Sequence, residues 1–331
     1  MYQTMKEVLS FGAGVQSTTL LLMSCEGILP KLDHVIFADT QWEPAAVYRH
    51  LEWCKEHAAK HGITIDVRTA GNLRKDLLEF WGPGRASADG KRHASIPAFI
   101  KNPDGSRGMV RRQCTGTYKI DVIEKYVRQE VFGLKKGERW PVPMLRVPDK
   151  HSPEGFRILE KDWFKESIYA KGAVDLPFEC VRQWIGISQD ETQRMKNSTR
   201  PAVVYWHPLV EAEHLTSVRP GSMFPKGMRR RDCVEWLESR GVNAPRSACI
   251  GCPFRHKAEW QALTREEFDD ACEVDRLIRR SESLRLESIG KNELIGQPYL
   301  HSSLVALDEA DLGRDEFGLG VETECTGGCG T

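Results

Sequence analysis

Short apolar runs alternate with amphipathic stretches through the first quarter of the chain. The run "EVLSF" predicts a β-strand at 7–11, and the stretch 17–26 predicts a helix that ends at Gly27, where a C-terminal cap would stand. The same unit returns twice more, with strands expected at 32–40 and 63–69, a helix that starts near Pro44 and ends before Gly62, and a helix at 72–81. Alternating elements with short connections predict a parallel sheet with helices on both faces.

The pattern changes after residue 81. Gly, Pro and basic residues dominate 82–112, which is read either as a mobile substrate lid or as a solvated insertion without a role. Helical periodicity returns at 118–131, a loop-rich stretch covers 133–177, and "VRQWIGIS" predicts another buried strand before a mostly helical remainder. We therefore expect an α/β domain with a doubly wound, Rossmann-like sheet in residues 1–200. A mostly helical, cysteine-rich region with a mobile tail is expected in residues 201–331.

Composition sets limits on the class of protein. The 331 residues carry 47 basic and 47 acidic side chains, so no overall field attracts nucleic acid or a membrane surface. No signal-peptide pattern or membrane-spanning apolar run is found, which predicts a cytoplasmic protein without a membrane partner. Because a reducing compartment keeps thiols free, the ten cysteines favour metal or redox chemistry over structural disulfides.

The loop after the first predicted strand is a candidate anion site. Gly12, Ala13 and Gly14 precede Ser17 and Thr18 at the start of a helix, where backbone N–H groups and the helix dipole favour phosphate or sulfate. The spacing is neither the P-loop motif, which needs a lysine, nor the dinucleotide motif, which needs a glycine where Ser17 stands. A simple tight turn is the alternative interpretation.

The segment "SFGAGVQSTTLLL", followed by "VIFADTQWEPAAVYRHLEW", resembles the PP-loop adenine-nucleotide α-hydrolase superfamily. Within it, the chain is most similar to the phosphoadenosine phosphosulfate (sulfonucleotide) reductases, whose motif residues correspond to Gly14, Gln16, Asp39, Thr40 and Tyr48. The resemblance implies a PP-loop (HUP-type) fold and an adenine nucleotide ligand: adenosine phosphosulfate, its 3′-phosphorylated form, or ATP. The ATP-splitting branch usually has an aspartate at the position of Gln16. A neutral amide is a poor magnesium ligand, which argues against Mg-ATP chemistry.

Basic residues elsewhere are candidate donors to a phosphosulfate or pyrophosphate. Arg112 and Lys119 flank Cys114, and Arg194 and Lys196 follow the predicted strand at 181–188. For each of them an exposed, solvated charge is the alternative interpretation.

Cysteine spacing predicts a metal site. Cys249 and Cys252 form a C-x-x-C pair, whose two-residue gap lets both thiolates reach one metal centre. "RRQCTGTYKIDVI" resembles the segment that supplies cluster ligands in iron-sulfur sulfonucleotide reductases, although that segment has two adjacent cysteines and here Thr115 follows Cys114. We expect Cys233 as the fourth ligand, with Cys180 or the C-terminal pair as alternatives. A 4Fe-4S cluster is the expected cofactor, zinc is the competing metal, and a chain without metal is the third possibility considered.

The tail contains Cys325 and Cys329 among glycines, which suit a mobile segment. The resemblance implies that Cys325, preceded by Glu324, is the catalytic nucleophile that attacks the sulfate sulfur. The resulting S-sulfocysteine is then reduced by a thioredoxin-like dithiol partner. A metal-ligand pair and a redox-active dithiol are the alternatives for the two tail cysteines, and a disordered tail is the third.

Three classes of function follow. The leading hypothesis is an oxidoreductase of sulfur metabolism that reduces an adenylyl phosphosulfate. The second is an ATP-dependent PP-loop sulfurtransferase that thiolates a nucleic acid or a nucleotide, which the helical region after Ser198 favours. The third is a non-catalytic protein that binds a nucleotide or a cluster.

Overall fold

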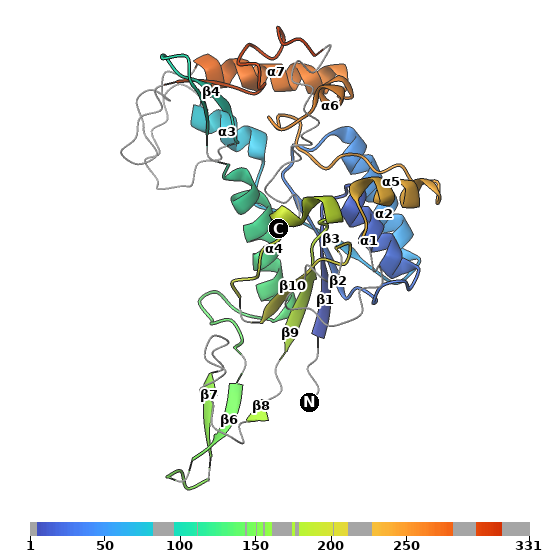
Figure 1. Ribbon diagram of the computed structural model, residues 1–331, viewed down its shortest axis with the longest axis vertical. Coiled ribbons are helices and arrows are strands. Elements are labelled where there is room, and N and C mark those ends of the chain that lie inside the picture. Colours follow the sequence, from blue (N-terminus) through green and yellow to red (C-terminus); the bar gives the residue numbers. More distant parts are fainter. Residues whose placement is uncertain are drawn as a thin grey trace.

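The fold is built on a five-stranded sheet whose strands all run parallel (Figure 1). The computed structural model describes residues 5–81, 96–110, 112–142, 144–149, 151–154, 156–160, 174–175, 179–200, 202–210, 227–280 and 296–312. The strand order is β10-β9-β1-β2-β3, with bounds Val203–Trp206, Cys180–Trp184, Met5–Phe11, His34–Asp39 and Ile65–Thr69. The predicted parallel α/β sheet is therefore confirmed.

Helices cover both faces of this sheet. One face carries α1 (Val15–Cys25), α2 (Ala45–Ala59) and α5 (Arg230–Glu238), and the other carries the continuous helical segment η1 (Gly116–Ile120), α4 (Asp121–Tyr126) and η2 (Val127–Val131). Neighbouring residues of β1 alternate between two cores, since Leu9 packs with α1 and Val8 packs with α4. This alternation explains why consecutive residues of β1 and β2, such as Val8 and Leu9 or Val35 and Ile36, are all apolar and buried.

Glycine and proline end and begin the first helices, as the sequence predicts. Gly27 and Gly62 follow α1 and α2 with positive φ angles of 71° and 66°, a conformation that glycine adopts at little cost. Pro44 directly precedes α2 and has a φ of −59°, already suited to a helix start. Gly14 precedes α1 in an extended conformation, and its N–H donates to Ser17 Oγ at 3.3 Å.

A second group of elements lies beyond the carboxyl ends of the parallel strands (Figure 1). It comprises α3 (Leu73–Trp81), α6 (Lys257–Gln261), α7 (Arg265–Arg280) and a small sheet of β4 (Phe99–Lys101), β5 (Arg107–Met109) and β11 (Gln297–Tyr299). Their apolar side chains form a separate core that includes Trp42, Ile250 and Trp260. This core fixes the loops that follow the parallel strands.

Three features differ from expectation. The stretch 82–112, read as a lid or an insertion, contains the strands β4 and β5, while residues 82–95 of it lie outside the described part. Residues 133–177 contain an antiparallel sheet of β6 (Met144–Pro148), β7 (Phe156–Glu160) and β8 (Val174–Asp175), which projects beyond the amino ends of the central strands (Figure 1). The central sheet also continues past the predicted boundary at residue 200, because β10 is its edge strand. In the part of the chain that the structure describes, no helix is long and apolar enough to span a membrane.

Candidate functional site

A pocket opens at the N-terminus of α1, at the carboxyl ends of β1 and β9. It is lined by Ser10, Gly14, Val15, Gln16, Ser17, Gly186, Arg194, Arg230, Arg246 and Ser247. Three guanidinium groups thus share a hollow with the positive end of a helix, and both features favour an anion. We call this hollow the anion pocket. No Asp or Glu is among the described residues that line it.

Glycines allow the chain segments around this pocket to approach each other closely. A Cβ on Gly186 would lie 3.2 Å from Ser17 N, and a Cβ on Gly14 would lie 3.0 Å from Ser247 Cβ. Ala13 has a φ of 55°, a left-handed conformation that is costly for a residue with a side chain. The loop from residue 12 to 14 is therefore tightly constrained.

Four of the predicted nucleotide-binding residues, Gly14, Gln16, Ser17 and Arg194, line the anion pocket. Gln16 Nε2 donates to Glu191 Oε2 at 3.0 Å, and the other oxygen of Glu191 accepts from Arg194. Glu191 and Arg194 belong to the short helix η4 (Gln189–Arg194). Glu191 thereby joins the first turn of α1 to η4 and orients Arg194 at the pocket.

Other predicted residues lie differently. Thr18 is fully buried, its Oγ1 lies 3.0 Å from His50 Nε2 and its N–H donates to Gly14 O, so it packs α1 against α2 and does not reach the pocket. Lys196 is exposed and is not among the lining residues. Gly12 and Ala13 are not among the lining residues. Gly12 donates its N–H to Ser17 Oγ at 3.3 Å, which helps to fix the conformation of the loop.

Six lining residues of the anion pocket were not predicted from the sequence, and three of them carry polar groups of interest. Arg230 opens α5 in a basic run that reads as solvated, and Arg246 and Ser247 lie directly before the C-x-x-C pair. The Oγ of Ser247 is buried and has no hydrogen-bond partner among the described residues. A buried hydroxyl without a partner is unusual, and a ligand oxygen would satisfy it.

A second pocket lies next to the first. Its lining includes Cys114, Cys249 and Cys252 together with Thr40, Arg112 and Lys119. We call it the cysteine pocket. Because Ala248 and Cys249 line this pocket while Arg246 and Ser247 line the anion pocket, one short segment forms a wall of both.

That segment is braced from within. Arg255 donates to the backbone carbonyls of Ala248, Cys249 and Ile250, and Cys252 N donates to Cys249 O at 3.1 Å. Arg246 donates to Phe254 O at 2.8 Å and forms an ion pair with Glu259. We call residues 246–259 the cysteine knuckle. Its internal hydrogen bonds make it a compact unit.

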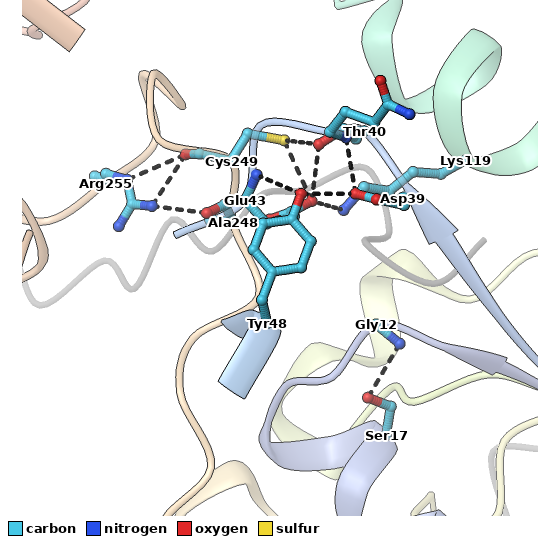
Figure 2. A network of polar contacts seen from close by, with 11 residues as sticks. Gly12, Ser17, Asp39, Thr40, Glu43, Tyr48, Lys119, Ala248, Cys249 and Arg255 are labelled. Atoms are coloured by element: carbon cyan, nitrogen blue, oxygen red, sulfur yellow. Dashed lines mark hydrogen bonds and ion pairs between the residues drawn. The ribbon is translucent and has the colours of Figure 1, made fainter. Parts of the chain in front are cut away.

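A buried network connects the knuckle to the loop after β2, as Figure 2 shows. Glu43 is 3% exposed, and its Oε1 accepts from Thr40 Oγ1 and from Lys119 Nζ, each at 3.2 Å. Cys249 Sγ lies 3.5 Å from the same oxygen and 3.3 Å from Thr40 Oγ1. Burial raises the pKa of the Cys249 thiol well above its ordinary value, and the Glu43 carboxylate raises it further. Glu43 was not predicted, because its function depends on residues far along the chain.

Asp39, predicted at the nucleotide site, organises the same loop. Its Oδ1 accepts from Tyr48 Oη at 2.9 Å and from Gln41 N at 2.8 Å. Burial raises the pKa of Tyr48, and the hydrogen bond to Asp39 adds to the effect. Asp39 is not among the lining residues of either pocket, and its neighbour Thr40 lines the cysteine pocket.

Three of the four predicted metal ligands thus face one pocket. Cys233 does not, because it is fully buried in α5 against α1, where burial raises its pKa to about 12. Cys180 pairs with Met5 at the amino end of the sheet, and Cys325 and Cys329 lie outside the described residues. Within the described residues, no three His, Cys, Asp or Glu side chains converge to hold an ion. Thiolates are the ligand type that zinc and iron-sulfur clusters prefer, but among the described residues Cys114, Cys249 and Cys252 line one pocket without forming a group that could hold an ion.

No protein-family model matches the chain, and no curated protein or solved structure matches it significantly.

Proposed function

We propose that this protein is a cytoplasmic enzyme of sulfur metabolism, of the sulfonucleotide reductase type. It binds the phosphate end of an adenylyl phosphosulfate in the anion pocket and carries out cysteine chemistry next to it. The observation that supports this function is the shared wall: Arg246 and Ser247 line the anion pocket, and Cys249 and Cys252 line the cysteine pocket.

The charges of the anion pocket favour an anion bound directly by the protein. Three arginines line it, and the lining residues that the structure describes include no carboxylate to hold magnesium. A phosphosulfate needs donors of this kind, whereas ATP usually binds with a metal ion. Guanidinium groups also stabilise the negative charge that develops on the phosphate as the sulfate group leaves it.

In the proposed reaction a thiolate attacks the sulfur of the phosphosulfate. The bond between sulfur and the phosphate oxygen breaks, and its electron pair leaves with adenosine monophosphate, giving an S-sulfocysteine. A thioredoxin-like dithiol then supplies two electrons and sulfite is released. The proposed nucleophile is Cys325, on the basis of the sequence resemblance. A cluster or zinc ion held by Cys114, Cys249 and Cys252 would fix the knuckle relative to η1.

Sulfite release tests this function. Protein purified without oxygen is incubated with thioredoxin and either adenosine phosphosulfate or its 3′-phosphorylated form. We expect one substrate to give sulfite and its nucleotide product in equal amounts, with no loss of rate when magnesium is chelated; the nucleotide is adenosine monophosphate from adenosine phosphosulfate and adenosine 3′,5′-bisphosphate from the 3′-phosphorylated form. Arg230→Ala should lower kcat/KM at least about ten-fold, as expected for one lost charged contact. Absence of sulfite from both substrates would overturn the proposal.

One observation favours the second candidate, an ATP-dependent sulfurtransferase. Glu191 places a carboxylate 3.0 Å from Gln16, the position at which the ATP-splitting branch has its aspartate. This candidate predicts pyrophosphate release from ATP that requires magnesium and added tRNA or DNA, and that Glu191→Gln abolishes. The same Glu191 oxygens already contact Gln16, Ser188 and Arg194, which is why we favour the reductase.

A further inference from the structure

The cysteine knuckle has chemically different groups on its two sides. Arg246 and Ser247 present a guanidinium and a hydroxyl to the anion pocket, and Cys249 and Cys252 present thiols to the cysteine pocket. Any ligand that contacts the first pair therefore acts on the segment that carries the second pair.

The hydroxyl of Ser247 is the group of this wall that a ligand would contact. Its Oγ is buried without a hydrogen-bond partner among the described residues, although the residue lines a pocket built for an anion. Its Cβ lies close to Gly14, at the N-terminus of α1, where a bound phosphate would be held by the helix. A phosphate oxygen at this position would accept a hydrogen bond from the Ser247 hydroxyl.

The knuckle transmits such a contact because it is braced. Arg246 is tied to Phe254 and Glu259, and Arg255 holds three successive carbonyls from Ala248 to Ile250. A shift of Ser247 therefore moves the thiol-bearing turn with it. The outer side of the turn rests on the loop after β2, through the hydrogen bond from Ile250 N to Trp42 O at 2.9 Å, the packing of Gly251 against the Trp42 ring and the contact of Cys249 with Thr40.

We propose that Ser247 and Arg246 bind the phosphate oxygens of the nucleotide and that this contact closes the knuckle, so that occupancy of the anion pocket controls access to Cys249 and Cys252. The inference depends on the proposed function, since it requires a nucleotide phosphate in that pocket. The new element is that ligand binding in the anion pocket changes access to the thiols of the cysteine pocket, and that Ser247 transmits this effect.

The test combines binding with thiol labelling on the full-length protein, from which a chelator has first removed any metal, because a metal-bound thiolate is blocked from reacting with iodoacetamide. Adenosine 5′-monophosphate is the probe, its affinity is measured by calorimetry, and iodoacetamide labelling of each cysteine is followed by mass spectrometry. We expect saturating probe to slow labelling of Cys249 and Cys252 at least about five-fold, while the half-buried Cys25 labels at an unchanged rate.

Ser247→Ala removes the hydroxyl with little change of shape. It should weaken binding of the probe about ten-fold, the effect of losing one hydrogen bond to a charged group, and should abolish the protection even when the probe is saturating. Ser239→Ala, at an exposed serine after α5, is the matched control and should retain both properties. Arg246→Lys is a second variant with the same expected losses, and circular dichroism verifies that each variant is folded.

The outcomes separate the two proposals. If the wild-type protein does not bind the probe, or if Arg230→Ala binds it equally well, the proposed function fails. If Arg230→Ala weakens binding of the probe but Ser247→Ala matches the wild type in affinity and in thiol protection, the coupling between the pockets is overturned. The proposal that the anion pocket binds the nucleotide would remain.

Discussion

The indole ring of Trp42 lies directly against Gly251, so that a Cβ on residue 251 would be 2.2 Å from Trp42 Cη2. The ring is anchored, because Trp42 Nε1 donates to Asp270 Oδ2 at 2.6 Å and Asp270 pairs with Arg74. Glycine is therefore required between the two cysteines of the C-x-x-C pair. The contact also determines how the knuckle rests on the loop after β2.

Gly251→Ala should displace the knuckle, since neither the ring nor the backbone can move without breaking hydrogen bonds. We expect a loss of about 2 kcal/mol in the free energy of unfolding, measured with urea, and faster iodoacetamide labelling of Cys249. Gly116→Ala is the control, because a Cβ at residue 116 meets nothing within 4 Å. Equal stability of the two variants would contradict the role given to Trp42.

The ion pair between Glu43 and Lys119 is buried, with side chains 1% and 10% exposed. Glu43→Gln removes the negative partner and should cost roughly 3 kcal/mol of unfolding free energy, because a buried charge loses its compensation. Replacing both residues, as Glu43→Gln with Lys119→Met, should cost clearly less than the sum of the single changes. Additive losses in a double-mutant cycle, measured by urea unfolding, would show that the two side chains do not stabilise each other.

Two buried histidines predict that the protein loses stability in acid. Burial lowers the pKa of His50 and of His207 to about 4, whereas an unfolded chain titrates near the ordinary value of 6.5. The unfolded state therefore binds more protons between these values, and the free energy of unfolding falls as the pH drops from about 6.5 towards 4. Each histidine should contribute on the order of 2 kcal/mol to this loss.

Urea unfolding at a series of pH values measures the effect. The variant His50→Gln, which keeps a polar group near Thr18, should show a shallower decline with pH than the wild type. An identical pH profile for the two proteins would mean that His50 is not held neutral by burial.

Metal analysis tests the assignment of the cysteines. Visible absorption together with iron, sulfide and zinc content should show metal in the protein purified without oxygen. Cys114→Ser, Cys249→Ser and Cys252→Ser should each lower that content at least several-fold, because each removes a thiolate ligand. Cys233→Ser should retain the wild-type content, since this thiol is buried between α1 and α5. If Cys233→Ser loses metal while the protein stays folded, Cys233 is a metal ligand, as expected from the sequence.

The first three strands and helices were predictable because their signals are local. Apolar runs, Pro44, Gly27 and Gly62 specify them within a few residues, and the structure confirms each. The sheet of β6, β7 and β8 was missed, since strands of two to five residues among prolines depend on their cross-strand partners.

Only the part of the candidate site that lies within one continuous segment could be predicted from the sequence. Gly14, Gln16 and Ser17 of the predicted loop line the anion pocket, whereas helix α1 turns the side chain of Thr18 towards α2. Arg230 could not be told from a solvated charge, since a basic run looks the same on a surface and beside a pocket. Glu43 and Ser247 could not be predicted, because their importance depends on contacts with residues distant in the sequence.

The separation of these contacts along the chain has a consequence for biosynthesis. Cys249 meets Glu43 across 206 positions, and the anion pocket is closed by residues from the same late segment. The ribosome therefore releases the glycine loop long before the segment that completes the pocket. A chain that stops before this segment lacks Arg230, Arg246 and Ser247 and cannot form the complete anion pocket.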